Sequence, residues 1–326
     1  MGRKRSTPWN YHPDLPIAVS PLFSWPPRPA AWLKWIASYW VAVSSVTLEL
    51  ALAFIVYTWF QPSWDTMQTL SPGWIAQIWV RNVILICLVA GGLHLWFITF
   101  AAQGQQLKFD KRDQVRNSRT FTFGNQVHDN MFWSIASGVT AWTFYEVLWF
   151  WAAANGYAPQ ITFAGNPVWF VAWFLLIPVW SSFHFYWVHR WLHWPPLYRR
   201  AHALHHRNIN VGPWAGISMH PVETTLYFSS VLIHFVVPSH AIHVLFHLYL
   251  EGLNPAFSHS GYEGVLIKDR KRLETGDFFH QLHHRFFDCN YGTAEVPWDR
   301  IFGSFHDGSE QATTRLRDRK VQIRSE

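Results

Sequence analysis

Histidines at regular short spacings are the residues of this sequence best suited to chemistry. The chain holds 19 histidines in 326 residues. Eight of them form one HxxxH and two HxxHH boxes: His189 and His193; His202, His205 and His206; His280, His283 and His284. On a helix, residues three or four positions apart share one face, with Cβ atoms about 5–6 Å apart. Because imidazole suits iron, zinc and copper, we predict that these eight side chains surround two metal ions.

Histidines outside the boxes fit simpler roles. A lone histidine is more often a capping, surface or satisfied core residue than a ligand. We expect such roles for His12, His94, His128, His234 and His306. The boxed residues differ from these because the same pattern recurs along the chain.

A few residues near the boxes are candidates for a further ligand or a supporting hydrogen bond. His259, in the stretch that begins at Asn254, is predicted as a ninth ligand. His220, in His220–Pro–Val–Glu223, is either another ligand or a cap at the start of the next helix. Metal-bound imidazoles need a partner for their other ring nitrogen, and Glu223, His247 and Asn254 are candidates for that role. We predict no catalytic residue beyond the metal centre itself.

Long apolar runs must position these boxes. Half of the residues are hydrophobic and 14% are charged, whereas average soluble domains carry roughly 25% charged residues. Four runs reach the roughly 20 residues that a helix needs to cross the hydrocarbon core. They are Trp32–Phe60, Trp74–Phe100, Phe132–Ala154 and Val168–Val188. The prediction is an all-α integral membrane protein with about four transmembrane helices.

Basic residues indicate how these helices are oriented. The loops Gln61–Gly73 and Asn155–Asn166 contain no Lys or Arg, whereas the N-terminal arm and the loop after the second span are basic. Since cytoplasmic loops carry the excess of Lys and Arg, both termini and the second loop are predicted to be cytosolic. The same pattern accounts for the net charge of +6 without a nucleic-acid partner.

The region around the last box divides into a hairpin and a cap. Pro238 splits the apolar run Thr224–Leu250 into two pieces, which favours a re-entrant helical hairpin over two unusually short spans. After Gly261 the chain becomes polar and is predicted to form a cytosolic, histidine-rich cap. We expect a cytosolic N-terminal arm over residues 1–31 and a single membrane-embedded domain over residues 32–326.

The boxes and their surroundings resemble the fatty acid hydroxylase/sterol desaturase superfamily over about residues 168–305. The resembling segments are Tyr186–Trp–Val–His189–Arg190–Trp–Leu–His193, His202–Ala–Leu–His205–His206, His259–Ser–Gly–Tyr262, His280–Gln–Leu–His283–His284, Asn290–Tyr–Gly292 and Trp298–Asp–Arg–Ile–Phe–Gly303. Ser182 stands where many family members have an aspartate, and nearby His184 is the candidate substitute.

The resemblance implies a non-haem di-iron enzyme that uses two Fe and O₂ to hydroxylate or desaturate a lipid. The lipid would be a fatty acyl chain, a polar lipid or a sterol-like molecule taken from the bilayer. A metal–oxygen oxidant suits this reaction because no side chain can attack an unactivated C–H bond. The sequence has no HPGG, GxGxxG or CxxC motif. Electrons are therefore expected from a separate protein, a ferredoxin or a cytochrome with its reductase.

Two other classes of function stay open at this point. A histidine-rich protein that binds or transports metal would place its ligands near the bilayer midplane. A zinc hydrolase would normally use three protein ligands on one ion. The boxes follow the end of a span and supply more ligands than one zinc ion needs, so the lipid oxygenase is the favoured prediction.

Overall fold

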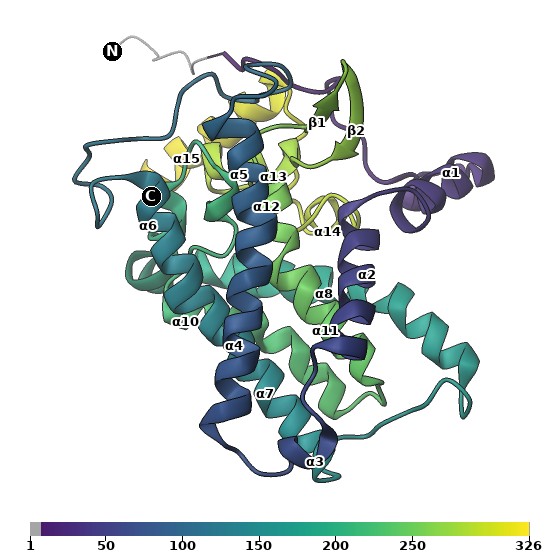
Figure 1. Cartoon of the computed structure of the whole chain (residues 1–326). Helices are drawn as coiled ribbons and strands as arrows, with labels where there is room; N and C mark the ends of the chain where they lie inside the picture. The colour runs from purple at the N-terminus through teal and green to yellow at the C-terminus, as the bar shows by residue number, and fades with distance from the viewer. Residues whose placement is uncertain (1–7, 326) are drawn as a thin grey trace.

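The computed structural model describes residues 8–325, which are mostly helical (Figure 1). Arg3, Lys4 and Arg5 of the predicted basic arm lie outside the described residues. The α-helices are α1 (Pro29–Trp40), α2 (Ser45–Trp59), α3 (Trp64–Met67), α4 (Pro72–Ile86), α5 (Gly92–His94), α6 (Gln126–Trp133), α7 (Thr140–Ala154), α8 (Pro167–Leu192), α9 (Pro195–Leu197), α10 (Pro221–Phe228), α11 (Ala241–Gly252), α12 (Asn254–Ser258), α13 (Phe278–Phe286), α14 (Trp298–Ile301) and α15 (Glu310–Ser325).

Short π-helical and 3-10 turns extend or link these helices. The π-helical segments are Cys87–Gly91, Leu95–Thr99, Ser134–Val139 and Tyr198–His202, and the 3-10 segments are Pro21–Phe23, His205–Arg207, Pro213–Ala215 and Ser229–Phe235. The π-helical turns make α4, α5 and the segments around them one continuous helix, Pro72–Thr99.

Two helices among the described residues are long and apolar enough to cross a membrane, Pro72–Thr99 and Pro167–Leu192. Helices α1 and α2 form a third if they are one bent span, since a 43° bend separates them. The 26 residues of α8 extend about 39 Å, enough for the roughly 30 Å hydrocarbon core. These helices correspond to the first, second and fourth predicted spans.

The first and third predicted spans differ from simple transmembrane helices. In the first, Ser44 and Thr47 form a capping box that begins a new helix after α1 has ended. In the third, the helical run from α6 through α7 is continuous, but polar residues reduce its apolar character. Among these, Asn130 and Glu146 are buried against other helices. Glu146 forms an ion pair with Arg81 of α4. The number of four spans stays a prediction.

The loops gather at two opposite ends of the helical bundle. The Asn155 amide donates to the Gln68 carbonyl at 3.0 Å, which joins the two loops that lack basic residues. At the other end, the Gln103 amide donates to the Gly264 carbonyl at 3.0 Å, and Trp9 packs edge-on against Phe278. Figure 1 shows α3 at one end and the cap at the other. This grouping is the one that the predicted topology requires, and which end faces the cytosol stays a prediction.

The segment around Pro238 forms two helical arms inside the bundle. One arm is α10 with the 3-10 turn Ser229–Phe235, and the other is α11. Every residue of α11 is buried, and this helix packs against α2, α7 and α8. Two helical arms are therefore present around Pro238, and the second lies at the centre of the protein; that this hairpin is re-entrant stays a prediction.

The cap contains a feature that an all-α fold does not include. Strands β1 (Gly264–Ile267) and β2 (Arg270–Glu274) pair antiparallel, with Ile267 opposite Arg270. Lys268 and Asp269 have φ values of 51° and 57°, which allow a two-residue hairpin turn. The all-α prediction was wrong here, because the turn residues Lys268 and Asp269 include no Gly or Asn, the residues typical of a two-residue hairpin turn.

Candidate metal centre

The nine histidines predicted as ligands converge in two groups. Group A consists of His189, His193, His202, His206 and His283, and group B of His205, His259, His280 and His284. Within each group the candidate ligand atoms all lie within 4.8 Å of one another. Eight of the nine side chains are buried, and His193 is partly buried. The structure thus brings together all nine residues from four separate stretches of sequence.

Helical geometry sorts the members of each box. His189 lies in the last turn of α8 and His193 is its C-cap, one turn later. Pro195 starts the next short helix, as predicted from its inability to continue α8. Each HxxHH box then supplies both groups, because neighbouring residues on a helix point in different directions. His205 and His206 enter groups B and A, respectively.

The last box divides in the opposite sense. His280 and His284, four positions apart on α13, share group B, whereas His283 enters group A. In the first HxxHH box the pair four positions apart, His202 and His206, shares group A. The doubled histidine in each box therefore links the two groups.

Hydrogen bonds to the Nδ1 atoms fix how several of these imidazoles are protonated. Three Nδ1 atoms face main-chain carbonyl oxygens: His189 with Tyr291 at 2.7 Å, His283 with Cys289 at 2.6 Å, and His259 with Pro255 at 2.9 Å. A carbonyl oxygen only accepts, so the hydrogen must be on Nδ1, and in a neutral ring Nε2 then carries a lone pair. That lone pair is directed into the group.

The Glu223 carboxyl group faces the Nδ1 atom of His202, as the carbonyl oxygens do for the other three rings. Its Oε1 lies 2.7 Å from His202 Nδ1, and both side chains are almost fully buried. Burial raises the pKa of Glu223 to about 7 and lowers the pKa of His202. A carboxylate that orients a histidine through its distal nitrogen is a common arrangement around metal-bound imidazoles. The predicted supporting role of Glu223 is consistent with this contact.

The distances between Nε2 atoms fit a cation in each group. His202 Nε2 lies 3.1 Å from the Nε2 atoms of both His189 and His193. In group B, His259 Nε2 lies 3.1 Å from His280 and 3.4 Å from His205. Facing lone pairs cannot hydrogen-bond to one another, whereas ligands about 2.1 Å from one ion lie roughly 3.0–3.4 Å apart. Imidazole donors suit iron among other transition metals, so the residues present fit the di-iron expectation.

Burial keeps these imidazoles in the form that binds metal. It lowers the pKa of each group member that lies beyond the end of α8 and has a resolved shift, namely His202, His205, His206, His259, His280, His283 and His284. Repulsion that a second protonated imidazole would meet from neighbouring histidines lowers the pKa further for most of them. A neutral imidazole is the form that coordinates a metal ion, so no proton has to be displaced near neutral pH.

Two residues that the spacing argument missed hold the loop beside group A. Asp299 accepts from the Tyr291 and Gly292 amides at 2.8 and 2.7 Å. Asn290 donates to the Phe279 carbonyl at 3.0 Å. This loop supplies the Cys289 and Tyr291 carbonyls that accept from His283 and His189. The family-like motifs Asn290–Tyr–Gly292 and Trp298–Asp–Arg carried the signal, but the sequence did not reveal the contact between them.

The remaining supporting candidates have hydrogen-bond partners outside the two groups. His220 accepts from the Val222 amide at 3.2 Å and caps α10, which was its alternative role. His184 Nε2 lies 3.0 Å from Ser229 Oγ, whereas Ser182 faces Thr293. His184 therefore does not take the place of the family aspartate. Asn254 donates to Ser45 at 3.2 Å, and His247 belongs to a separate polar cluster in the hairpin.

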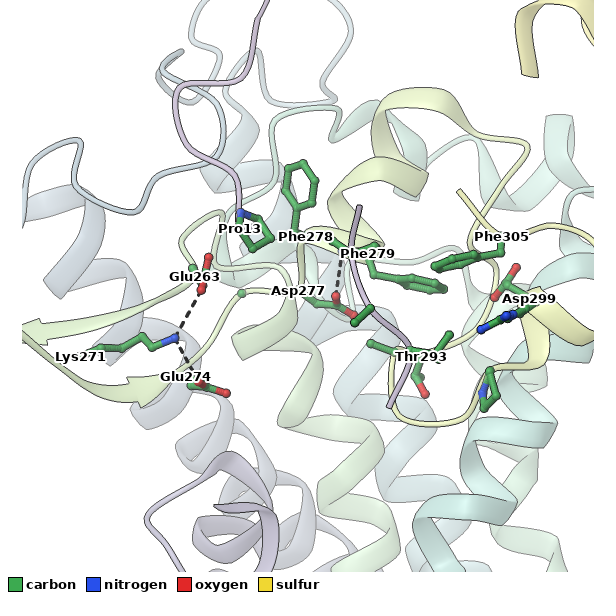
Figure 2. A pocket seen from close by; sticks show the side chains of 17 residues that line it. Pro13, Glu263, Lys271, Glu274, Asp277, Phe278, Phe279, Thr293, Asp299 and Phe305 are labelled. Carbon is green, nitrogen blue, oxygen red and sulfur yellow. Dashed lines mark hydrogen bonds and ion pairs between the residues drawn. The ribbon is translucent and has the colours of Figure 1, made fainter. Parts of the chain in front are cut away.

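A cavity of about 400 Å³ lies in the cap between the N-terminal arm and the start of α13 (Figure 2). Asp277 lines it and caps α13 by accepting from the Phe279 amide at 2.9 Å. Burial raises the pKa of Asp277 to about 7. Lys271, at the other side, pairs with Glu263 and Glu274. None of the nine imidazoles lines this cavity, so it is separate from groups A and B.

Comparisons with known proteins agree with this geometry. Residues 173–304 match the family model for fatty acid hydroxylase. The chain is 31% identical over 138 residues to a Delta(7)-sterol 5(6)-desaturase of Eremothecium gossypii, covering 41% of this chain and 37% of that protein. It is 33% identical over 142 residues to the corresponding enzyme of Saccharomyces cerevisiae, covering 41% and 36%.

A longer alignment has a lower sequence identity. A Delta(7)-sterol 5(6)-desaturase of Aspergillus fumigatus is 28% identical over 235 residues, covering 68% of this chain and 65% of that protein. The chain thus spans little more than a third of the first relatives, at 37% and 36% of their length. No solved structure matches. The matched region, residues 173–304, contains all nine converging histidines. The chain is thus similar to the fatty acid hydroxylase family over these residues and to sterol desaturases.

Proposed function

We propose that this protein is a membrane oxidoreductase that holds two iron ions in groups A and B and hydroxylates or desaturates a lipid with O₂. The observation that carries the proposal is the convergence of nine imidazoles, eight of them buried, into two adjacent groups at the end of a membrane-capable helix. Bound there, two irons would supply the oxidising power that an unactivated C–H bond requires.

The roles of the chain's own residues follow from their contacts. The Cys289, Tyr291 and Pro255 carbonyls, with Glu223, would hold the imidazoles in one tautomer and one orientation. Such partners preserve metal affinity because a ligand that is already oriented loses less freedom on binding. Burial of the groups would exclude bulk water from the reacting atoms.

The substrate and the electron donor belong to the same proposal. The relatives are sterol desaturases, so a sterol-like lipid is the first substrate to test, with fatty acyl and other polar lipids as alternatives. Because both groups lie at the end of α8, a lipid would enter sideways from the bilayer. We propose a multi-pass protein with cytosolic termini. A separate ferredoxin, or a cytochrome with its reductase, would deliver the electrons to that side.

Metal transport is the weaker alternative. A transporter would place its ligands near the bilayer midplane and leave them accessible from both sides. Groups A and B instead lie where α8 ends and the cap begins, and eight of their nine imidazoles are buried.

The test combines metal content with product analysis. Protein purified without a metal-affinity tag should contain about two irons per chain. In lipid nanodiscs with O₂, a reduced electron donor and sterol, mass spectrometry should show either a gain of one oxygen or a loss of two hydrogens. Full activity with stoichiometric zinc and no iron would overturn the proposal, as would iron-loaded protein that oxidises none of the three lipid classes.

A further inference from the structure

A chain of buried polar side chains runs through the hairpin, apart from groups A and B. Ser239 Oγ lies 2.6 Å from His234 Nδ1, and His234 Nε2 lies 3.0 Å from His247 Nδ1. His247 Nε2 lies 3.1 Å from Ser230 Oγ, which in turn donates to Glu251 Oε1. We call these five residues the hairpin chain. They are connected end to end, from Ser239 in the turn between the two arms to Glu251 near the end of α11.

The hairpin chain is unusual for its surroundings. Four of its members are fully buried and Glu251 is 2% exposed, within a predominantly apolar bundle. Buried polar groups are costly unless they are hydrogen-bonded, and packing alone would be served as well by apolar side chains. The linear arrangement differs from a metal site, in which the donor atoms converge on one point. Chains of His and Glu inside membrane proteins mark proton relays.

One end of the hairpin chain reaches a loop of the bundle. The Ser239 amide donates to the Pro159 carbonyl at 3.2 Å, and the Ile161 amide donates to the Ser239 carbonyl at 3.3 Å. These contacts join Ser239 to the predicted outer loop, Asn155–Asn166. Trp173 Nε1 also donates to Ser239 Oγ at 2.9 Å. A proton from water at this loop would have a short path to the first hydroxyl.

The other end lies close to group A. Tyr227 donates to the Glu251 carbonyl at 3.0 Å and packs edge-on against Phe185, with ring centroids 5.8 Å apart. Phe185 stacks on His189 of group A at 4.9 Å. Glu251 Oε2 is buried and has no hydrogen-bond partner among the described residues, although Ser181 donates to Oε1 at 3.1 Å. Tyr227 thus contacts the main chain of Glu251, whereas the carboxyl group bonds to Ser181, which lies one helical turn before Phe185 and about two turns before His189 on α8.

We propose that the hairpin chain is a proton relay that makes Glu251 a proton donor to the reaction at groups A and B; the inference rests on the proposed function. Hydroxylation combines C–H, O₂, two electrons and two protons into C–OH and one water. Desaturation uses the same inputs and yields a C=C bond and two waters. The donor protein supplies the electrons, and water at the loop supplies the protons.

Each member of the hairpin chain can pass a proton. A neutral imidazole accepts on one ring nitrogen and releases from the other, and a hydroxyl does the same on a single oxygen. Titratable groups that face Glu251 come from four helices: His247 from α11, His184 from α8, Tyr227 from α10 and Tyr145 from α7. Neither Glu251 nor any of these four residues is a member of group A or B.

The first test needs no metal. Infrared spectroscopy of the metal-free protein in D₂O should show the carboxyl band of protonated Glu251, which Glu251→Gln removes. Its rate of hydrogen–deuterium exchange reports the relay. His247→Phe should slow this exchange at least about 10-fold, and His234→Phe should do the same at a second point. The control is His243→Phe, one turn away on α11, fully buried and bonded to the Phe170 carbonyl; it should exchange like the wild type.

The second test uses the iron-loaded enzyme. General acid catalysis typically contributes about 10²–10⁴-fold, so Glu251→Gln should lower turnover by at least roughly 100-fold while iron content stays at the wild-type level. Wild-type turnover in Glu251→Gln, or unchanged exchange in both relay variants, would overturn the relay and leave the proposed function intact. A wild-type enzyme that oxidises no lipid would instead overturn the proposed function, whatever the exchange rates are.

Discussion

At the scale of single residues, adjacent histidines within one box belong to different groups of candidate metal ligands. His283 enters group A and His284 enters group B, although they are neighbours on α13. His205 and His206 divide in the same way. Loss of one such residue should therefore weaken one group directly and the other only through their shared helix.

His283→Ala tests this arrangement. The variant should fold, because the helical bundle does not depend on this side chain, but its iron content should drop and turnover should fall by more than about 100-fold. Loss of a mere hydrogen-bond partner already costs about 10–100-fold in metal affinity or activity. His306→Ala is the matched control, since His306 is also buried in the cap but belongs to neither group. Normal iron and turnover in His283→Ala would contradict metal binding by group A.

Asp299→Asn tests a residue that touches no histidine. Asp299 accepts from two loop amides, at 2.8 and 2.7 Å, and an asparagine would place a donor against one of them. The Tyr291 carbonyl should then orient His189 less well. We expect iron affinity to fall by about 10–100-fold with the helical content unchanged. Titration of the metal-free variant with Fe²⁺ measures this, and wild-type affinity would show that the loop is not held by Asp299.

At the scale of elements, close contacts between loops and helices set the position of group B. A Cβ atom on Gly216 would lie 2.5 Å from the Pro255 carbonyl carbon. Pro255 lies in the first turn of α12, and its carbonyl accepts from His259 Nδ1. His259, a predicted ligand that lies outside the three boxes, is thus held in place by the close approach of the loop at Gly216 to α12.

Gly216→Ala should move this helix. Overpacking of a filled site typically costs about 1–3 kcal/mol, so the temperature of unfolding in detergent should fall. Iron bound to group B should decrease at the same time. Gly92→Ala is the control, because no atom lies within 4 Å of its added Cβ. Equal stability of the two variants would mean that α12 can move to accommodate the added Cβ at no cost in stability.

At the scale of the whole molecule, burial of many neutral imidazoles makes stability depend on pH. Burial lowers the pKa of His202, His206 and His284, among others. The unfolded chain, whose imidazoles titrate near about 6.5, then binds more protons than the folded protein. For the metal-free protein, the free energy of unfolding should therefore decrease as the pH falls below about 6.5. Denaturation at pH 8 and pH 5 checks this; equal stability would contradict the buried neutral form.

The topology is a second property of the whole molecule. Reporter fusions at Thr66 and Gln160 should lie on the outer side, and fusions at Gln114 and the C-terminus on the cytosolic side, because Lys and Arg concentrate in the latter segments. A cytosolic signal at Gln160 would contradict four spans. The contact between the loops at Asn155 and Gln68 requires that Thr66 and Gln160 give the same result.

The sequence by itself predicted most of the helical segments, the two helical arms around Pro238 and which histidines converge, but not the break between α1 and α2. Apolar runs, a proline and spacings of three and four residues are local features, and helix geometry turns them directly into structure. The β1–β2 hairpin was missed because its turn lies in a polar segment without a Gly or Asn signal.

Only the tertiary structure decided how the histidines divide. Residues of one box separate into two groups because the helix directs neighbouring side chains differently, and their partners come from segments about 75 residues away, as His206 and His283 show. The same holds for Asp299 and for the hairpin chain, whose members meet across the packed arms. Contacts between distant segments depend on how helices pack, and no local pattern in the sequence encodes that packing.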